Sequence, residues 1–336
     1  MATRIAINGF GRIGRAVARI LFSEANKDLE LVAINDLTDA KMLAHLLKYD
    51  SVHRTFAKEI SASEDSLSID GKVVRVSAQR DPAKLEWASQ EVDVVLECTG
   101  RFRTRETAGL HLEAGAKKVI ISAPAKTADA TIVMGVNHDI YRADEHHILS
   151  NASCTTNCLA PPAKVLLDNF GIERGMLTTV HAYTNDQALL DVPHRQGDLR
   201  RSRAGATNMV PTTTGAAKAI YGIIPELEGK FQGMAVRVPT VDVSLIDLCV
   251  ETTKNTTADE VNAAMKKAAS EGPMSEVLNY TEEELVSSDY IGCPASSTIE
   301  GKLTRVLGDN MVKIVAWYDN EWGFSNRMVG LTRHIS

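Results

Sequence analysis

A cysteine among small polar residues is the first side chain of this sequence that could act as a nucleophile. Cys154 lies in the segment Ser-Cys-Thr-Thr-Asn-Cys (residues 153–158), which has the composition of a helix start. Backbone N–H groups at a helix N-terminus stabilise a thiolate. The same segment is equally typical of a buried structural cysteine beside N-cap hydroxyls. Pro161 and Pro162 leave the start of the helix open, because a helix that began after them would stabilise the thiolate less.

A histidine downstream could supply the base for such a nucleophile. His181 lies in Thr-Thr-Val-His-Ala-Tyr-Thr-Asn-Asp (residues 178–186), where the pattern predicts a strand over 176–182. A lone histidine in a strand is more often a core residue than a catalyst. The upstream cysteine and the hydroxyl and amide groups that follow favour a Cys–His pair for nucleophilic and acid–base catalysis. Whether the two side chains meet in space depends on the fold.

A glycine-rich turn near the N-terminus has the spacing of a dinucleotide-binding motif. Gly9, Gly11 and Gly14 follow an expected strand and begin an expected helix, and Asp36 ends the next strand. The glycines permit a tight turn and the close approach of a pyrophosphate to the helix N-terminus. The carboxylate of Asp36 would accept hydrogen bonds from the ribose and repel a 2′-phosphate, which favours NAD over NADP.

Anion-binding side chains gather in the second half of the sequence. Arg-Arg-Ser-Arg (residues 200–203), Thr-Thr-Thr-Gly (residues 212–215) and Arg237 offer guanidinium groups, hydroxyls and a glycine backbone. Guanidinium geometry suits phosphate binding. Solvated charges at subunit contacts are the alternative for Arg200 and Arg203, and this alternative is weaker for Arg237, which lies between valines in an expected strand.

The elements that must position these residues fall into two types. The first 150 residues alternate apolar strands with helices, which predicts a doubly wound parallel Rossmann-type sheet. The next part carries longer strands, an alternating pattern over 241–248 and a capping box at 257–260, which predict an α+β domain with a mostly antiparallel sheet. The last eighteen residues are expected to be helical and to return to the first domain. We therefore predict an α/β protein whose NAD-binding domain comprises residues 1–153 and 319–336, with a catalytic domain at 154–318.

Composition excludes several other classes. The 336 residues are 44% hydrophobic and 24% charged, with a formal net charge of −6, which argues against a broad nucleic-acid-binding face. No apolar run approaches the length of a membrane span, and no secretory signal precedes the first strand. Five cysteines, an odd and sparse set, predict a reducing, cytoplasmic compartment, and their spacing gives no metal site.

Five stretches of the sequence resemble the phosphorylating glyceraldehyde-3-phosphate dehydrogenase family. They are residues 6–15, 150–161, 179–187, 213–218 and 317–323, and together they span nearly the whole chain. The resemblance implies an NAD-dependent oxidoreductase of glycolysis and gluconeogenesis that converts D-glyceraldehyde 3-phosphate and inorganic phosphate to 1,3-bisphosphoglycerate. In that reaction Cys154 would form a hemithioacetal and then a thioester, and His181 would take the hydroxyl proton.

The resemblance also implies the other site residues. The substrate phosphate would be held by Thr184, Arg201 and Arg237. The attacking phosphate would be held by Ser153, Thr155, Thr214 and Gly215. The cofactor NAD would contact the three glycines of the turn together with Arg12, Ile13, Asp36, Arg80, Ser122 and Asn320. No metal is implied, and the family is usually a homotetramer in which the loop 184–208 packs across subunits.

Three positions bear on specificity within the family. NADP-using relatives tend to carry a hydroxyl residue after the acidic position and a serine near 193, whereas this sequence has Leu37 and Pro193. Phe324 stands where many members of the family have tyrosine. Related erythrose-4-phosphate dehydrogenases also have phenylalanine at this place, so erythrose-4-phosphate dehydrogenase activity is the alternative. The segments around His181 and Thr214 instead favour the triose enzyme. A third hypothesis is a thiol sensor that uses this fold without turnover. The sequence does not decide whether Cys154 and Cys158 form a disulfide on oxidation.

Overall fold

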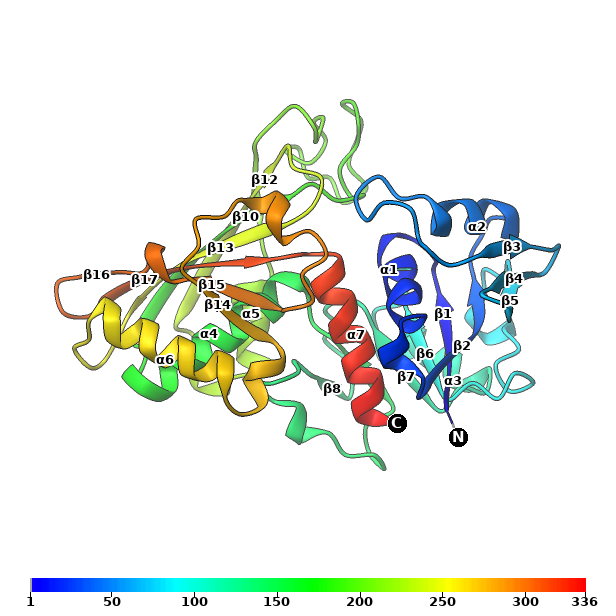
Figure 1. Cartoon of the computed structure of the whole chain (residues 1–336), viewed down its shortest axis with the longest axis horizontal. Coiled ribbons are helices and arrows are strands. Elements are labelled where there is room, and N and C mark those ends of the chain that lie inside the picture. The colour runs from blue at the N-terminus through cyan, green and yellow to red at the C-terminus, as the bar shows by residue number, and fades with distance from the viewer. Residues whose placement is uncertain (1) are drawn as a thin grey trace. The chain divides into compact units, whose positions relative to one another are not determined.

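The computed structural model describes residues 2–336, which divide into two compact units. Unit 1 contains the described chain through Ile132, then His138–Ser153 and Phe324–Ser336. Unit 2 contains Val133–Asn137 and Cys154–Gly323. Each unit is built around its own sheet (Figure 1).

Unit 1 is a mainly parallel sheet with strand order β3-β4-β5-β2-β1-β6-β7-β9-β8. Its strands are β1 Thr3–Asn8, β2 Leu29–Asn35, β3 Ile60–Ala62, β4 Ser66–Ile69, β5 Lys72–Ser77, β6 Val94–Glu97, β7 Lys118–Ile121, β8 Ala130–Thr131 and β9 Ile148–Ser150. Its helices are α1 Arg12–Leu21, α2 Ala40–Lys48, α3 Arg105–Glu113 and most of α7 Trp322–Ile335. Among the described residues of this sheet, only the β3–β4 and β4–β5 pairs are antiparallel.

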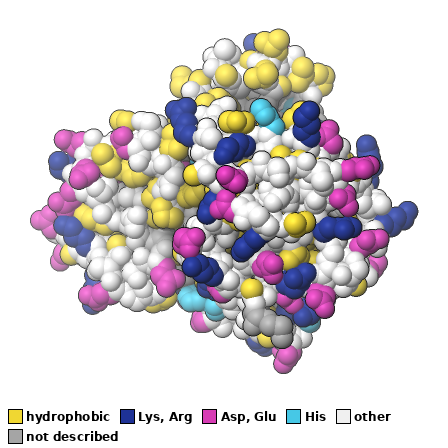
Figure 2. Space-filling model, turned by 45° about the vertical axis from the view of Figure 1, so that its right-hand side comes forward, with side chains coloured by type: hydrophobic (Ala, Val, Ile, Leu, Met, Phe, Trp, Pro, Cys, Tyr) yellow, Lys and Arg dark blue, Asp and Glu magenta, His cyan; other side chains and the backbone are white. Residues whose placement is uncertain are grey.

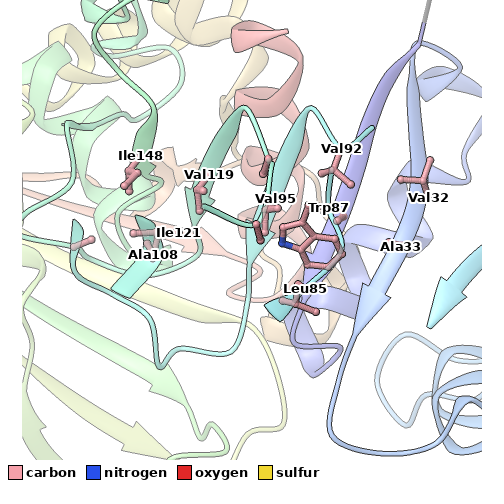
Figure 3. Close-up of a cluster of buried hydrophobic side chains, with 14 residues drawn as sticks. Val32, Ala33, Leu85, Trp87, Val92, Val95, Ala108, Val119, Ile121 and Ile148 are labelled. Carbon is pink, nitrogen blue, oxygen red and sulfur yellow. The ribbon is translucent and has the colours of Figure 1, made fainter. Parts of the chain in front are cut away.

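The central strands of unit 1, β1, β2, β6 and β7, are mostly buried on both faces, which explains their continuous apolar runs. All four residues of β6 are buried, as are the last four of β1. One side of the sheet packs Val95, Val119 and Ile121 against Ala108 of α3, with Trp87 filling the space beside them (Figure 3). This core contains residues of β1, β2 and β6, which pair side by side, and the glycine-rich turn begins at the carboxyl end of β1.

The C-terminal helix is fixed to unit 1 by specific contacts. The predicted terminal helix is α7, and its residues from Phe324 onward belong to unit 1. The Arg333 guanidinium donates to the Asp28 carboxylate at 2.7 Å, and the Tyr141 hydroxyl lies 3.5 Å from the Ile335 carbonyl oxygen. The first bond attaches the end of the chain to the segment before β2, and the second contact lies at the segment before β9.

Unit 2 is a mostly antiparallel sheet of order β11-β12-β10-β13-β17-β15-β14, with β16 paired to β17. Its strands are β10 Arg174–Ala182, β11 Val210–Thr213, β12 Phe231–Val238, β13 Ser244–Glu251, β14 Leu278–Thr281, β15 Ser297–Glu300, β16 Arg305–Leu307 and β17 Met311–Tyr318. Its helices are α4 Cys154–Phe170, α5 Ala216–Ala219 and α6 Ala258–Ser270. The β10–β12 and β14–β15 pairs are parallel. The predicted fold class is confirmed.

Local sequence explains the elements of unit 2. Residues of β13 alternate between buried and half-buried, as expected for a sheet with one covered face. The alternating pattern expected over 241–248 forms a strand only from Ser244, as β13, because an irregular segment at 239–243 separates it from β12. Helix α6 begins at the predicted capping box, in which Thr257 and Glu260 exchange hydrogen bonds.

The segment between β10 and β11, residues 183–209, contains no helix or strand. It is the long loop that the sequence predicts, and turns and ion pairs hold it, among them the pair between Arg203 and Asp191 at 2.6 Å. No helix in the described residues has the length and apolar character needed to cross a membrane.

Candidate active site

Cys154 is the first residue of α4, so the helix begins before Pro161 and Pro162, which lie inside it. The open question about the helix start is therefore resolved: the N-terminal N–H groups of α4 lie at the cysteine. The chain enters α4 through Ala152, whose φ of 56° is in the left-handed region. The Ala152 N–H donates to the Ser150 hydroxyl at 3.1 Å, which holds this strained turn in place.

The structure brings the predicted nucleophile and base together. Cys154 Sγ lies 3.5 Å from His181 Nε2. His181 is buried near the end of β10, and its Nδ1 lies 2.7 Å from the Ala182 carbonyl oxygen. Arg237 Nη1 also lies 3.1 Å from Nδ1, but its two hydrogens have acceptors in Thr184 Oγ1 and the Ala182 carbonyl oxygen. Because a carbonyl only accepts and lies closest, we assign the proton to Nδ1, which leaves the Nε2 lone pair facing the sulfur. This is the tautomer that a general base needs.

Burial of this pair favours the neutral form of both side chains. Burial, followed by the positive charge of Arg237, lowers the pKa of His181 to about 3. Removal from water raises the pKa of the Cys154 thiol, and the Arg237 charge and the Thr155 hydrogen bonds oppose that rise only in part. Thiolate stabilisation at the helix N-terminus is thus outweighed by desolvation in the free protein. A neutral imidazole at neutral pH can still accept a proton.

A tyrosine beside the pair was missed by the sequence analysis. Tyr318, the last residue of β17, packs edge-on against the His181 ring with centroids 5.8 Å apart. Its hydroxyl lies 2.9 Å from Thr155 Oγ1 and 2.8 Å from Thr179 Oγ1. These bonds link α4, β10 and β17, so they fix the cysteine helix to the strand that carries the base. Only the position of Tyr318 beside Asn320, in one of the resembling stretches, could have indicated it.

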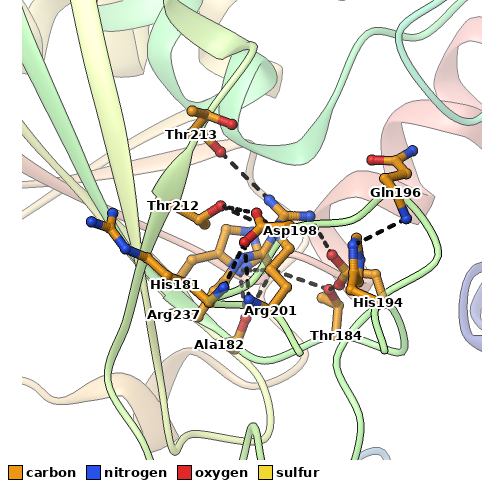
Figure 4. Close-up of polar contacts among 12 residues, drawn as sticks. His181, Ala182, Thr184, His194, Gln196, Asp198, Arg201, Thr212, Thr213 and Arg237 are labelled. Carbon is orange, nitrogen blue, oxygen red and sulfur yellow. Dashed lines mark hydrogen bonds and ion pairs between the residues drawn. The ribbon is translucent and has the colours of Figure 1, made fainter. Parts of the chain in front are cut away.

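Arg237 lies directly next to the base. It is paired with His181 in the parallel β10–β12 register. Its Nη1 donates to Thr184 Oγ1 at 3.0 Å and to the Ala182 carbonyl oxygen at 3.2 Å (Figure 4). The structure therefore brings two of the three expected substrate-phosphate contacts, Thr184 and Arg237, to one place.

The third contact, Arg201, is bound by two acids that the sequence analysis did not identify. Its guanidinium pairs closely with Asp186 through Nη1, and its Nε lies 3.6 Å from Asp198 and 3.1 Å from Thr212 Oγ1 (Figure 4). Thr184 also donates to Asp186. Asp186 thus connects the Thr184 and Arg201 positions, and a substrate phosphate would meet side chains that a carboxylate already bridges.

The residues expected at the attacking phosphate lie at two helix starts. Thr155 is in the first turn of α4, and Gly215 directly precedes α5. Thr214 Oγ1 accepts the N–H of Ala216 at 3.2 Å, which stabilises the start of α5. Ser153 directly precedes Cys154. These positions offer hydroxyls and backbone N–H groups, which suit an oxyanion.

The glycine-rich turn in unit 1 has the packing that its motif requires. Gly9 has a φ of 93°, and a Cβ on it would lie 2.7 Å from the Thr99 nitrogen. A Cβ on Gly14 would lie 2.3 Å from the Gly9 carbonyl oxygen. Gly11, the N-cap of α1, faces open space. Two glycines permit the tight turn, and the third leaves the helix N-terminus accessible, so the turn fits a pyrophosphate.

A cavity of about 340 Å³ lies at this turn. Its walls contain Gly9, Gly11, Asp36 and Arg80 of the expected cofactor residues. The Asp36 carboxylate accepts the N–H groups of Phe10 and Leu37, both at 2.7 Å. These bonds fix the carboxylate of Asp36 just after β2, in the wall of the cavity.

The remaining expected cofactor residues lie elsewhere in the two units. Arg12 pairs closely with Asp50. Ile13 and Gly14 are in the first turn of α1, and Ser122 follows β7, where its N–H donates to the Glu97 carbonyl oxygen at 3.0 Å. Asn320, in unit 2, is buried, and its Oδ1 accepts the Ser244 hydroxyl at 2.7 Å. Phe324 is also buried.

Comparison with known proteins identifies the family. Residues 3–105 match the model of the glyceraldehyde 3-phosphate dehydrogenase NAD binding domain, and residues 153–320 match that of the C-terminal domain. The chain is 59% identical over 334 residues to glyceraldehyde-3-phosphate dehydrogenase 1 of Bacillus cereus, covering 99% of this chain and 98% of that protein. It is 59% identical over 336 residues to glyceraldehyde-3-phosphate dehydrogenase of Geobacillus stearothermophilus, covering 100% and 99%.

A more distant relative agrees. Glyceraldehyde-3-phosphate dehydrogenase of Streptomyces coelicolor is 55% identical over 332 residues, covering 99% of this chain and 98% of that protein. The expected oxidoreductase activity and the expected NAD cofactor are confirmed by these matches. The chain belongs to the glyceraldehyde-3-phosphate dehydrogenase family.

Proposed function

We propose that Cys154 and His181 carry out the oxidation and phosphorylation of D-glyceraldehyde 3-phosphate in this chain. One observation supports the assignment above the others. The unprotonated Nε2 of His181 faces the Cys154 sulfur at 3.5 Å while Nδ1 is occupied by the Ala182 carbonyl. A nucleophile, a base within reach of it and a group that orients the base form the arrangement that covalent catalysis requires.

The first step joins the substrate to the protein. The Cys154 sulfur bonds to the aldehyde carbon, and the thiol proton passes by way of His181 Nε2 to the carbonyl oxygen. Because burial and the Arg237 charge lower the pKa of His181, its imidazole is neutral at physiological pH and its Nε2 lone pair is available to relay the proton. The product is a hemithioacetal on Cys154.

Oxidation and phosphate transfer follow on the same residues. His181 takes the hydroxyl proton as the aldehyde carbon is oxidised, which leaves a thioester on Cys154. Bound NAD supplies the acceptor for the hydride. An oxygen of inorganic phosphate then attacks the thioester carbon, the C–S bond breaks, and His181 returns its proton to the sulfur. The thioester retains the energy of oxidation, which hydrolysis would lose.

The charged cluster of unit 2 supports the two phosphate sites. Thr184, Arg201 and Arg237 would bind the phosphate of the substrate, because two guanidinium groups and a hydroxyl converge there. The attacking phosphate would be bound by hydroxyls and backbone N–H groups of Ser153, Thr155, Thr214 and Gly215. Since Asp186 already joins Thr184 and Arg201, substrate binding would exchange a carboxylate for a phosphate at these residues.

The residues that would hold NAD all belong to one domain expected from the sequence. Gly9, Gly11, Gly14, Arg12, Ile13, Asp36, Arg80 and Ser122 would bind it in a domain formed by residues 1–153 and 319–336. Asn320 would orient the nicotinamide amide, and residues 154–318 would form the catalytic domain. The fixed Asp36 carboxylate supports a preference for NAD, because it would repel a 2′-phosphate.

The exposed apolar loop supports assembly into a homotetramer. Leu189, Leu190 and Leu199 are 86%, 76% and 84% exposed in the loop 183–209. Figure 2 shows hydrophobic side chains gathered at the upper end of the view, the end at which Figure 1 draws this loop. Single chains rarely leave such a patch in water. Sedimentation equilibrium should give about four times the chain mass of 36.5 kDa, and a mass of one chain would contradict the assembly.

A cytoplasmic location is supported by the cysteines. All five are free thiols, with Cys158 buried and the others half-buried. Proteins of oxidising compartments rarely retain five unpaired thiols. Fractionation of the native cells should recover the activity with the cytoplasmic enzymes, and recovery in a secreted fraction would contradict the location.

The catalytic assignment is tested by replacing the nucleophile. Cys154→Ser should reduce NADH production from glyceraldehyde 3-phosphate and phosphate by at least about a thousandfold, because a serine hydroxyl is a weaker nucleophile, is far harder to deprotonate than a thiol and forms no thioester. Cys249→Ser, at a half-buried thiol of β13, is the matched control and should retain full activity. Survival of turnover in the Cys154 variant would refute the proposed function.

A further inference from the structure

A hydrogen-bonded network of fully buried side chains lies behind the dinucleotide cavity. It consists of Trp87, His111 of α3 and Glu97 at the end of β6, all three at most 1% exposed. Trp87 packs within the core of unit 1, beside the strands that end at the cavity (Figure 3). A carboxylate in such an apolar setting is costly unless every lone pair is satisfied.

The tryptophan fixes the tautomer of the histidine. Trp87 Nε1 lies 3.0 Å from His111 Nδ1, and an indole nitrogen can only donate. His111 Nδ1 is therefore an acceptor, so its proton is on Nε2. His111 Nε2 lies 3.1 Å from Glu97 Oε2 and donates to it. A neutral histidine thus transmits the position of a core tryptophan to a buried carboxylate.

Glu97 receives four donors. Oε1 accepts the Thr99 N–H at 2.8 Å and also the Thr99 hydroxyl, whose oxygen in turn accepts the Arg101 N–H at 3.0 Å. Oε2 accepts from His111 and from Asn8 Nδ2 at 2.5 Å. Both oxygens of the buried carboxyl group therefore accept hydrogen bonds, two each, from the backbone and side chains around it.

The network continues into the cavity wall, where Asn35 donates to Asn8 and Asn8 donates to Glu97. The Asn8 amide oxygen accepts Asn35 Nδ2 at 2.7 Å, which requires that Asn8 donate toward Glu97. Asn35 in turn accepts the Gln79 N–H at 2.8 Å and the Ser77 hydroxyl at 2.9 Å. Four of these residues, Asn8, Asn35, Gln79 and Thr99, line the cavity of about 340 Å³. One buried carboxylate therefore orients side chains on two sides of the cavity.

We propose that Glu97 is a positioning residue for NAD: without touching the cofactor, its carboxylate holds Asn8 and Thr99 in the cavity wall, with Trp87 and His111 behind it. The proposal rests on this cavity being the NAD site. Replacing the carboxylate by an amide should disrupt it, because the NH₂ group of Gln would face two donors whichever way it is turned. In one orientation of the amide the Thr99 N–H and hydroxyl lose their acceptor. In the other, Asn8 Nδ2 and His111 Nε2 lose theirs.

The test measures NAD affinity separately from catalysis. Glu97→Gln should raise the dissociation constant of NAD, measured by calorimetry, by at least about tenfold. At saturating NAD its kcat and its KM for glyceraldehyde 3-phosphate should stay within about twofold of wild type, because Cys154 and His181 lie in unit 2. Trp87→Phe keeps the carboxylate and most of the packing, so it should raise the same dissociation constant by a smaller factor of about three.

Glu300→Gln is the matched control. Glu300 is a buried glutamate of unit 2 that accepts Trp317 Nε1 at 2.7 Å, so its substitution disturbs a similar bond away from the cavity. It should leave NAD affinity unchanged. An unchanged NAD affinity in Glu97→Gln would overturn the proposal, as would an equal loss in Glu300→Gln. If Glu97→Gln does not fold, an unchanged affinity in Trp87→Phe overturns it. Failure of wild type to bind NAD would refute the proposed function instead.

Discussion

The cavity of unit 1, proposed to bind NAD, and the phosphate cluster of unit 2, the residues Thr184, Arg201 and Arg237 proposed to bind the substrate phosphate, are held by different kinds of contact. Around the cavity, Asn8 and Glu97 are buried at strand ends, and the amide of Asn8 donates a hydrogen bond to the carboxylate of Glu97. In the phosphate cluster, Arg201 comes from a loop without helix or strand and is held by the carboxylates of Asp186 and Asp198. The first site is fixed by burial and the second by exchangeable charges.

The difference matches what each site must do. A cavity whose walls are fixed by buried hydrogen bonds loses little conformational freedom when a large cofactor binds. A cluster of arginines neutralised by acids can exchange a carboxylate for a phosphate at little electrostatic cost. Cys154 and His181 are placed by regular elements, the start of α4 and the end of β10. We therefore expect substitutions to affect catalysis, substrate affinity and stability separately.

The largest effect is expected at the base. His181→Asn should lower kcat by about a hundredfold to ten-thousandfold while leaving NAD affinity intact, because proton transfer is lost and the cavity of unit 1 is not altered. Steady-state rates and NAD calorimetry on the same preparation check this. A loss of NAD affinity parallel to the loss of kcat would break the distinction between the two regions.

An intermediate effect is expected in the phosphate cluster. Arg201→Gln should lower kcat/KM for glyceraldehyde 3-phosphate by roughly 10–100-fold, since a hydrogen-bonded charge contact to phosphate is lost. Activity on unphosphorylated glyceraldehyde should change little. Arg203→Gln, on the same loop and paired at the surface with Asp191, is the control and should behave as wild type. Equal losses on both substrates would mean that Arg201 supports the loop rather than the phosphate.

The smallest effect is expected in stability, at Asp50, the ion-pair partner of Arg12 at the start of α1. Burial would raise the pKa of Asp50, but the hydrogen bond from Arg12 and those from the His53 and Val52 N–H groups outweigh it, so this pKa is lowered to about 2. Since the folded value lies below the unfolded one, Asp50 stabilises the folded state above about pH 4 and loses this contribution as the pH falls toward 2. Asp50→Asn should therefore lower the free energy of unfolding by about 2 kcal/mol at pH 7.

Urea denaturation between about pH 2 and pH 7 measures the difference in free energy of unfolding between wild type and Asp50→Asn. The gap between Asp50→Asn and wild type should narrow below about pH 4. Asp168→Asn removes an exposed partner of Lys164 on α4 and should cost less than about 1 kcal/mol. A gap for Asp50→Asn that is constant with pH would show that the ion pair with Arg12 is not its source.

Local sequence was sufficient for much of this molecule. The glycine-rich turn, the capping box of α6 and the strand that carries His181 each follow from short patterns whose physical requirements are local. Tyr318, Asp186, Asp198 and the Trp87–His111–Glu97 network were not predicted. Their roles depend on contacts between elements far apart in the chain, such as the one between Thr155 and Tyr318. A tryptophan, a histidine or an aspartate has no local pattern that distinguishes such a contact from ordinary packing.

The thioester on Cys154 and its cleavage by phosphate are the centre of this account, and NADH formation with and without phosphate tests them most directly. Without phosphate, reduced protein given NAD and glyceraldehyde 3-phosphate should form a rapid burst of about one NADH per chain and then slow greatly. Added phosphate should restore continuous turnover. Steady turnover that ignores phosphate would contradict the account, because it would mean that water releases the acyl group, as expected for an erythrose-4-phosphate type of enzyme.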